Sequence, residues 1–279
     1  MSKFKIGIQL YTLREEMEKD VEATLKAVAE MGYDCVEFAG YFGKTAEEMK
    51  ALLDRYGLEA ISVHQGYDPF IGADAQAQVD YLKTLGVKFC AIPWMGVEKH
   101  AGNDVYPQTV EEITKVGKLL KDNGIQLLYH NHDFEFETFE GKYLLDWLYE
   151  SVPAEYLQTE LDCCWVKYAG EEPVKYIKKY ADRADVLHLK DFVCKSLKGG
   201  PVYDLIDEDG KELGTETTTE DNGFEFRPVG QGLQDFPSII KAAEEAGISY
   251  LIVEQDSWPT CPALEAAKQS REYLKTLGL

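Results

Sequence analysis

The sequence predicts a single (β/α)8 barrel over residues 1–279, and three observations lead to this fold class. Eight short apolar runs recur along the chain, and each is followed by a segment with helical spacing. Five of the helical segments close with a glycine shortly before the next apolar run, which is typical of a loop between a helix and a strand. Eight such units in one domain favour a closed barrel. An open doubly wound sheet is the alternative, but no GxGxxG motif opens its first unit.

The expected strands are short and apolar on both faces, as when one face packs inside the barrel and the other packs against helices. In chain order they occupy residues 4–10, 35–38, 60–64, 89–93, 126–130, 157–162, 186–189 and 250–254. The glycines that precede five of them are Gly32, Gly57, Gly86, Gly124 and Gly247.

Two of the expected helices show their start as well as their period. Asp20 is a good N-cap and precedes an apolar stripe that begins at Val21. Asp235 stands in the same relation to a stripe that includes Ile239 and Ala243. These segments therefore fit the helices that follow the first and seventh strands.

One polar segment, residues 195–226, interrupts the regular alternation of expected strands and helices, between the seventh strand and its helix. It is acidic, rich in turn residues and longer than a loop that only joins a strand to a helix. Insertions at the carboxyl ends of barrel strands lie over the active site, so we interpret the segment as a lid or a substrate-selecting loop. A solvated hairpin or an oligomer contact is the alternative.

The composition limits the classes of partner. The chain has 50 acidic and 29 basic residues, which give a formal net charge of −21. This charge repels polyanions, so we expect a small-molecule substrate and no nucleic-acid partner. Six cysteines without a CxxC pair indicate reduced thiols, and no apolar run reaches the length of a membrane span. We expect a cytoplasmic protein without a membrane partner, and we leave homo-oligomerisation open.

Polar side chains end the last three expected strands: Asp162, His188 and Glu254. In a barrel these strands are neighbours, and their carboxyl ends meet at one mouth. An imidazole with two carboxylates is a ligand set for a divalent metal, for which Mn²⁺ is our first choice; Co²⁺, Zn²⁺ and Fe²⁺ also fit, and Mg²⁺ fits less well. Each residue alone has the alternative role of a capping side chain, but three on consecutive strands favour the metal site.

The fifth expected strand runs into the segment LLYHNHDFEFE, whose alternation places His130 and His132 on the inward face. His132 lies nearer the mouth and is the candidate for a fourth metal ligand or a proton-transfer group. His130 lies deeper, where it orients a ligand or contacts the substrate. Glu135, just beyond the strand, is the alternative ligand or base. Either histidine has the alternative role of a hydrogen-bonded core imidazole.

Further candidates follow other strands. Lys190 is a candidate acid or substrate ligand, with a plain salt bridge as the alternative. Glu37 and His64 end the second and third strands, where inward polar groups need a partner or a polar ligand. Trp94 follows the fourth strand and offers a sugar an aromatic face, or packs. Arg227 precedes a glycine-rich stretch and a helix, a weak anion-binding pattern for which a simple turn is the alternative.

These motifs resemble the xylose-isomerase-like (β/α)8 superfamily of sugar phosphate isomerases and epimerases, whose members include ketose 3-epimerases, hydroxypyruvate isomerase, inosose dehydratase and endonuclease IV. The resemblance covers nearly the whole chain, from IGIQLYTLRE, GYDCVEFAG and LDCCWVKYAG to VLHLKDF, RPVGQGLQDF and IVEQD. It implies metal ligands at Asp162, His188 and Glu254. It also implies a sugar-facing or metal-facing role for Glu37 and His64.

Two positions depart from the pattern of that superfamily. Its epimerases carry on the fifth strand a glutamate that is both ligand and acid/base, where this chain has histidines and only then Glu135. The symmetrical two-glutamate mechanism is therefore not supported. Relatives also carry a histidine where this chain has Trp165, which weighs against an endonuclease that needs several metal ions.

The expected chemistry is proton transfer beside a carbonyl. A divalent metal would chelate a ketone and stabilise the enediolate, while Glu254, His132 or Glu135 removes the α-proton. The leading expectation is an isomerase or epimerase that acts on a keto-sugar or related polyol. A lyase that dehydrates a keto-inositol or 3-keto-sugar is the close alternative. A nuclease and a non-enzymatic sugar-binding barrel are weaker alternatives.

Overall fold

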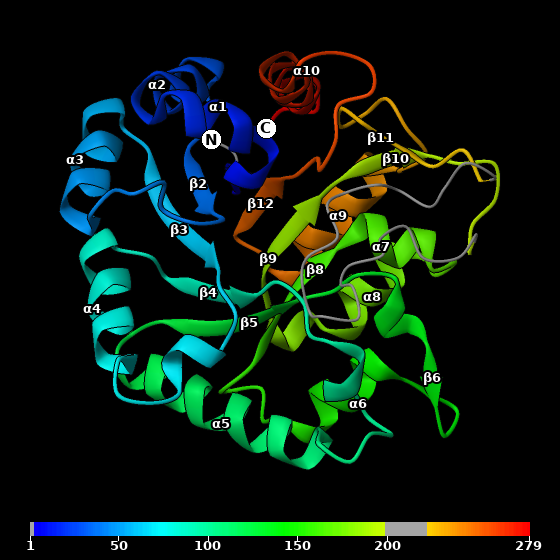
Figure 1. Ribbon diagram of the computed structural model, residues 1–279. Helices are drawn as coiled ribbons and strands as arrows, with labels where there is room; N and C mark the ends of the chain where they lie inside the picture. The colour runs from blue at the N-terminus through cyan, green and yellow to red at the C-terminus, as the bar shows by residue number, and fades with distance from the viewer. Residues whose placement is uncertain (1–2, 199–221) are drawn as a thin grey trace.

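Eight parallel strands close into a barrel, as Figure 1 shows in the computed structural model, which describes residues 3–198 and 222–279. The strands run in the order β1-β12-β9-β8-β5-β4-β3-β2 around the barrel. They are β1 (Lys5–Gln9), β2 (Cys35–Phe38), β3 (Glu59–His64), β4 (Phe89–Ile92), β5 (Gln126–His130), β8 (Gln158–Asp162), β9 (Ala184–Leu189) and β12 (Tyr250–Val253). The predicted fold class is confirmed.

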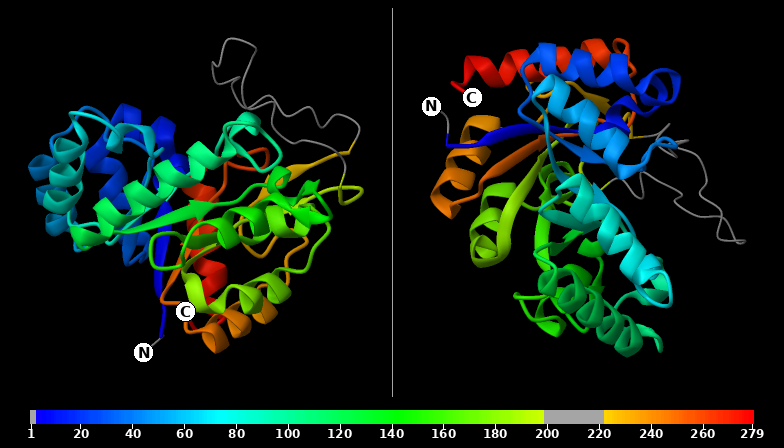
Figure 2. Two further views of the ribbon diagram at one scale, coloured as in Figure 1. Left: turned by 90° about the horizontal axis from the view of Figure 1, so that it is seen from below. Right: turned by 90° about the vertical axis from the view of Figure 1, so that its left-hand side faces the viewer.

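Helices surround the strands on the outside of the barrel (Figures 1 and 2). The α-helices are α1 (Arg14–Lys19), α2 (Val21–Met31), α3 (Ala46–Tyr56), α4 (Ala75–Leu85), α5 (Tyr106–Asp122), α6 (Leu144–Ser151), α7 (Cys163–Tyr168), α8 (Pro173–Lys179), α9 (Phe236–Ala246) and α10 (Ala263–Thr276). Short 3-10 turns are η1 (Leu10–Leu13), η2 (Asp68–Phe70), η3 (Val97–Lys99), η4 (Phe134–Phe136) and η5 (Ala181–Arg183). The last helix completes the ring against α2, where Arg271 donates to the carbonyl of Gly32 at 2.7 Å.

The predicted caps form where the sequence places them. The side chain of Asp20 accepts the backbone N–H of Ala23 at 2.9 Å, and Asp235 caps α9 in the same way. Gly32 ends α2 with φ of +89°, a left-handed conformation that glycine adopts without the steric cost of a side chain. Helix α5 differs slightly, because its C-cap is Asn123 and the predicted Gly124 is the next residue, also with positive φ.

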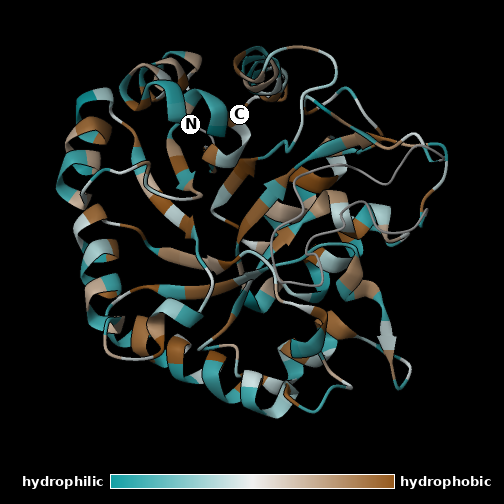
Figure 3. Cartoon of the chain, in the orientation of Figure 1, coloured by the Kyte–Doolittle hydropathy of each residue, from teal (hydrophilic) through white to brown (hydrophobic). Residues whose placement is uncertain are grey.

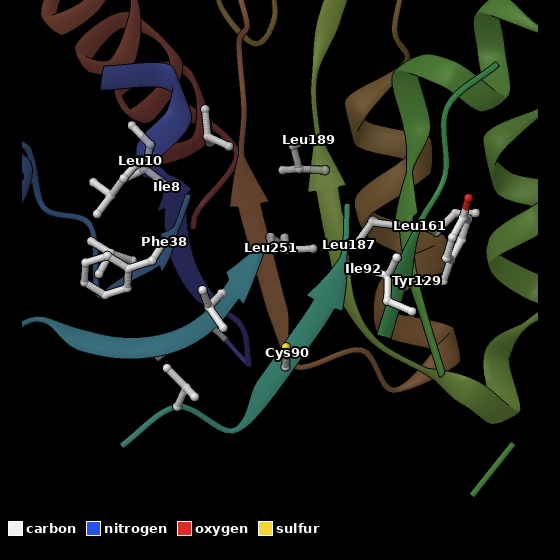
Figure 4. Packing of buried hydrophobic residues seen from close by; sticks show 14 of the residues in the cluster. Ile8, Leu10, Phe38, Cys90, Ile92, Tyr129, Leu161, Leu187, Leu189 and Leu251 are labelled. Carbon is white, nitrogen blue, oxygen red and sulfur yellow. The ribbon is translucent and has the colours of Figure 1, made fainter. Parts of the chain in front are cut away.

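Hydrophobic residues make up much of the barrel strands, as Figure 3 shows by colour, and they lie on both faces of the strands. The outward faces pack with the helices in one large core, and Figure 4 shows some of its strand residues, among them Leu161, Leu187 and Leu251. The inward faces form a separate apolar layer of Cys35, Ile61, Phe89, Ala91, Leu128, Val186, Tyr250 and Ile252. Gly7 leaves room for this layer, because a Cβ there would lie 2.5 Å from Cδ1 of Ile252.

The predicted insertion lies partly outside the described residues, since residues 199–221 are not among them. Its two flanks form an antiparallel pair of short strands, β10 (Asp191–Val193) and β11 (Glu225–Arg227). A second small hairpin, β6 (Thr138–Phe139) with β7 (Lys142–Tyr143), follows β5. The interpretation of residues 195–226 as a lid stays a prediction.

Candidate active site

Four polar side chains meet at the carboxyl ends of four neighbouring strands, and we call them the outer group. They are His130 from β5, Asp162 from β8, His188 from β9 and Glu254 directly after β12. All four are buried, and one ligand atom from each lies within 4.8 Å of the others. The structure therefore brings together the three strand-end residues singled out from the sequence and adds a histidine from the fifth strand.

The period of two along each strand explains why these side chains converge. Val186 belongs to the apolar layer inside the barrel, so His188, two residues further along β9, also faces inward. Asp162 is paired with His188 across β8 and β9, and Ile252 is paired with it across β12 and β9. Glu254 lies two residues beyond Ile252 and shares its face. The outer group thus forms a polar layer above the apolar layer.

The distances within the outer group fit a single metal ion. Nε2 of His130 lies 3.4 Å from Oδ2 of Asp162 and 3.6 Å from Oε2 of Glu254. Nδ1 of His188 lies 3.2 Å from Oε2 of Glu254 and 4.0 Å from Oδ2 of Asp162. Two ligands at about 2.1 Å from a metal at a tetrahedral angle are about 3.4 Å apart. Two imidazoles and two carboxylates are also a donor set that suits Mn²⁺, Co²⁺, Fe²⁺ and Zn²⁺.

Asp162 presents one oxygen to the outer group because its other oxygen is already bound. Oδ1 caps helix α7 and accepts the backbone N–H groups of Cys164 at 2.7 Å and Trp165 at 3.3 Å. Within the described part of the chain, Oδ2 of Asp162 and Nε2 of His130 are buried without a hydrogen-bond partner. Buried polar atoms are normally satisfied, so two such atoms side by side support a bound ion.

A buried ammonium group lies beside the outer group. Nζ of Lys190 is 2.9 Å from Oε2 of Glu254 and 2.5 Å from Oδ2 of Asp256, and it lies over the rings of Trp165 and Phe226. Burial opposes the charge of Lys190, but the carboxylates of Asp256 and Glu254 outweigh burial and raise the pKa of the amine. Lys190 is therefore a fixed positive charge at the site.

A second polar cluster lies below the outer group, and we call Glu37, His64 and Glu160 the inner group. Nε2 of His64 is 2.6 Å from Oε2 of Glu160 and 3.2 Å from Oε1 of Glu37. Gln9 donates to Oε1 of Glu37 at 2.8 Å, and the rings of His64 and His188 are stacked 5.4 Å apart. The structure thus places Glu37 and His64, both predicted to bind substrate, at the floor of the site.

The inner group also orients His188. Nε2 of His188 lies 2.8 Å from Oε1 of Glu37, while Nδ1 of the same ring faces Glu254. When Nε2–H donates to Glu37, Nδ1 keeps its lone pair for a ligand on the side of the outer group. Burial, with the nearby carboxylate of Glu160, raises the pKa of Glu37. Glu37 is therefore a partner of a metal-ligand candidate rather than a surface residue of the mouth.

The outer group contains His130, and the prediction of His132 as its fourth member needs correction on geometry. Strand β5 ends at His130, so the alternation that was expected to continue to His132 stops there. The ring of His132 is instead stacked on Phe134 at 5.2 Å and lies 5.5 Å from Trp165 and 5.0 Å from His130. Burial, and then the positive charges of His130 and Lys190, hold the pKa of His132 well below its ordinary value.

Glu135 is buried against the back of this segment and does not join the outer group within the described residues. Oε1 accepts the hydroxyl of Tyr129 at 2.5 Å, and Oε2 accepts the backbone N–H of His132 at 2.7 Å. Burial raises the pKa of Glu135 to about 7. The carboxyl group therefore braces the loop after β5, in contrast to its predicted role as a metal ligand or base.

Arg227 is held on β11 by local contacts. Its guanidinium lies 2.5 Å from Oε2 of Glu225 and donates to the carbonyl of Phe226 at 3.0 Å. The neighbouring glycine-rich stretch binds a carboxylate of the chain itself, that of Asp191. The predicted substrate-binding role of Arg227 is therefore without support from the geometry.

The carboxylate of Asp191 lies inside the glycine-rich loop. Oδ2 accepts the backbone N–H groups of Gly230 at 3.0 Å and Gly232 at 2.8 Å, and Oδ1 accepts those of Phe192 at 3.0 Å and Gln234 at 3.2 Å. Gly232 must lack a side chain, because a Cβ would lie 2.3 Å from Oδ1 of Asp191. The backbone N–H groups of the loop therefore donate to a carboxylate of the chain itself.

Two residues of the site, Asn131 and Asp256, were not identified from the sequence, and neither was Asp191 in the adjoining glycine-rich loop. The signal for Asp191 was present in the sequence, since a carboxylate ends HLKD and two glycines follow a proline in RPVGQG. Trp94 follows β4 and is half-buried, and its proposed contact with a sugar stays a prediction.

Two further sequence expectations concern the whole chain. All six cysteines are free, which agrees with the reading of reduced thiols. In the described ranges, no helix combines the length and apolar character needed to cross a membrane.

Comparison with known proteins agrees with the fold. The family described as xylose isomerase-like TIM barrel matches residues 25–277. An inosose dehydratase of Geobacillus kaustophilus (strain HTA426) is 25% identical in an alignment of 286 positions that covers 92% of this chain and 87% of the relative.

Solved structures with the same fold include a sugar phosphate isomerase/epimerase from Parabacteroides distasonis. It superposes with a TM-score of 0.74 at 24% identity and covers 97% of each chain. A probable 3-DHS dehydratase from Bacillus anthracis superposes with a TM-score of 0.71 at 15% identity and covers 98% of this chain and 99% of that one.

Proposed function

The chain belongs to the xylose isomerase-like TIM-barrel family, and from this premise we propose that it is a metal-dependent lyase that dehydrates a keto-sugar or keto-polyol. The observation that carries the proposal is the outer group, in which four buried side chains converge with their ligand atoms within 4.8 Å of one another. The curated relative that carries the name inosose dehydratase supports the same reaction class. Isomerase or epimerase activity, the leading expectation from the sequence, remains the alternative outcome of the test.

The residues that would hold the metal are His130, Asp162, His188 and Glu254. A divalent ion at this place would act as a Lewis acid toward a ketone and lower the cost of removing the neighbouring proton. The protein's own contribution is a rigid, buried set of donors that needs little rearrangement when the ion binds. We keep Mn²⁺ as the first candidate, because the donor set of two imidazoles and two carboxylates accepts it together with Co²⁺, Zn²⁺ and Fe²⁺.

His132 is the proposed base. Its imidazole lies next to the outer group and is buried, and its depressed pKa keeps it neutral near pH 7. A neutral imidazole accepts a proton, whereas an imidazolium cannot. In the proposed reaction His132 takes the proton from the carbon beside the ketone, and the electron pair of that C–H bond forms the enolate.

Lys190 is the proposed positive charge for the second half of the reaction. As the enolate collapses, its electrons form a carbon–carbon double bond and the C–O bond of the β-hydroxyl breaks. The departing hydroxide takes the proton that His132 removed and leaves as water. The ammonium of Lys190, already beside Glu254 and Asp256, lies where it stabilises the negative charge of these steps.

Elimination suits this site better than inversion of a stereocentre. Epimerisation by two opposed carboxylates needs a second acidic side chain on β5, where this chain has His130. Elimination needs one base and one cation, which His132 and Lys190 supply. A nuclease remains disfavoured by the net charge of −21.

The test is NMR of the Mn²⁺-loaded and Zn²⁺-loaded protein in D₂O with keto-inositols, 3-keto-sugars and simple ketoses. Zn²⁺ is included because it is diamagnetic and leaves the spectra sharp. We expect loss of water and a new vinyl or enol signal with at least one keto-polyol. Deuterium incorporation at the α-carbon without loss of water would instead make the protein an isomerase or epimerase and would overturn the lyase.

A further inference from the structure

The sheet around the barrel has a gap in its backbone pairing beside Asp162. The last paired residues of β5 and β8 are His130 and Glu160. Strand β5 ends there, whereas β8 continues to Asp162. On the side facing β5, the backbone N–H and C=O of Asp162 therefore extend beyond the last backbone partner that the sheet offers.

The side chain of Asn131 fills this gap. Its Oδ1 accepts the backbone N–H of Asp162 at 3.0 Å, and its Nδ2 donates to the carbonyl oxygen of Asp162 at 3.3 Å. Nδ2 also lies 3.5 Å from the carbonyl of His132, and the side chain is fully buried. A side-chain amide has the same donor and acceptor as a peptide group, so it continues the ladder by one rung.

We propose that Asn131 is a positioning residue, whose amide fixes the end of β8 and thereby aims Oδ2 of Asp162 at the metal. The inference rests on the proposed function, in which Asp162 is a metal ligand. Asn131 holds the backbone of Asp162, and the start of α7 holds its Oδ1. Because the backbone and Oδ1 of Asp162 are both held, its Oδ2 can point in only one direction.

The chemistry of this position explains why an amide is needed there. Aspartate would keep an acceptor for the backbone N–H but would turn a second oxygen toward the carbonyl of Asp162. Leucine has a similar size but offers neither group, and serine is too short to span both. The neighbours of Asn131 in sequence are a candidate ligand, His130, and the proposed base, His132. Residues 130–132 therefore provide, in this order, a candidate metal ligand, a positioning residue and the proposed base.

The experiment measures Mn²⁺ affinity by chelator competition in Asn131→Asp and Asn131→Ala. Partners outside the ligand shell typically change metal affinity by about 10-fold to 100-fold, and we expect a loss of this size. We also expect turnover to recover when Mn²⁺ is raised to saturation, because Asn131 orients a ligand and does not touch the substrate. Unchanged Mn²⁺ affinity in both folded variants would overturn the inference.

The matched control is Asn222→Asp. Asn222 is also a buried asparagine that joins two segments, since its Oδ1 accepts the N–H of Ser196 at 3.1 Å and its Nδ2 donates to the hydroxyl of Tyr168 at 3.0 Å. We expect its loss to lower the melting temperature as much as the loss of Asn131 does while Mn²⁺ affinity stays unchanged. If the control weakens Mn²⁺ binding equally, Asn131 has only a structural role.

A second readout does not depend on the metal. Hydrogen exchange of the Asp162 amide in the metal-free protein should be about tenfold faster in Asn131→Ala, because its acceptor is gone. Unchanged protection would overturn the positioning role even if the metal site is real. Conversely, a wild-type protein that binds no Mn²⁺ would overturn the proposed function, and the exchange data would still decide whether Asn131 holds β8.

Discussion

Asp162 and Asp191 are two buried aspartates that follow or end neighbouring strands, yet their carboxylates are used in opposite ways. Asp191 accepts four backbone N–H groups, two on each oxygen. Asp162 accepts two, both on Oδ1, and leaves Oδ2 buried without a hydrogen-bond partner among the described residues. The difference lies in the number of donors around each group and not in burial, which is complete for both.

This contrast offers a physical criterion that separates a structural carboxylate from a candidate ligand. A carboxylate has about four lone-pair directions, and a fold that fills all of them leaves nothing for a ligand. A fold that fills half of them and buries the rest leaves an oxygen that is unfavourable until a cation arrives. The same criterion removes the glycine-rich loop from the list of anion sites, since Asp191 already occupies it.

The largest effect should come from Asp162→Asn. Asparagine keeps an oxygen for the start of α7 and is a good N-cap, so the barrel should fold. The amide nitrogen in place of Oδ2 removes a charged ligand, and we expect Mn²⁺ binding to be lost and kcat/KM to fall roughly 10³-fold. Metal analysis and circular dichroism together check this. Full metal occupancy in the folded variant would show that Asp162 is a capping residue only.

Asp191→Ala should produce the opposite pattern. Four backbone N–H groups, one of them in a fully buried hydrogen bond, would lose their acceptor, and at about 1 kcal/mol each the free energy of unfolding should fall by about 3–4 kcal/mol. Mn²⁺ affinity should stay close to that of the wild type, because Asp191 makes no contact with the outer group among the contacts described. Urea denaturation and chelator competition on the same samples measure the two quantities. A stable variant with weak metal binding would reverse the assignment of the two aspartates.

Glu135 sharpens the comparison, because it is a buried carboxyl with one donor on each oxygen. Its pKa of about 7 lies above the ordinary value of 4.5, so the folded state holds the proton longer than the unfolded state. The contribution of the protonated Glu135 carboxyl group to the free energy of unfolding is fully present below pH 4.5, falls as the pH rises toward 7 and is lost above pH 7. The difference between these two pKa values corresponds to about 3 kcal/mol in the free energy of unfolding.

Glu135→Gln removes the titration and is the direct check. The free energy of unfolding of the wild type, measured against that of Glu135→Gln, should fall between pH 5 and pH 8. Parallel profiles for the two proteins would show that Glu135 is ionised throughout this range. The variant should keep its Mn²⁺ affinity, since the outer group lies on the other side of the segment.

Much of the fold could be predicted because its signals are local. Each apolar run has the length of a strand, and the glycines that close the helices are read directly from the sequence, as at Gly32 and Gly247. The one misplaced cap, at Asn123, differs by a single residue. Closure of the barrel follows from the number of units, which requires no knowledge of individual contacts.

The convergence of the candidate side chains could be predicted where strand ends determine it and not where loops do. Asp162 and His188 follow from the period of two on their strands, and Glu254 from the same period continued by one residue. The structure places His130 and not His132 with the other three side chains, because β5 ends at His130, and the sequence does not show where this strand ends. Asn131 could not be found as a partner of Asp162, since the hydrogen bonds between them join segments about 30 residues apart.

The order of the strands has a consequence for how this protein could change. The outer group comes from β5, β8, β9 and β12, which are consecutive and occupy one half of the barrel. The other half, β1 to β4, contributes Glu37 and His64 of the inner group, and the half-buried Trp94 follows β4. If the proposed function holds, mutation and loop exchange on that half can therefore alter which substrate fits while the outer group stays in place. New specificities in such a barrel can arise by stepwise change of the half from β1 to β4, while the half that carries the outer group stays unchanged.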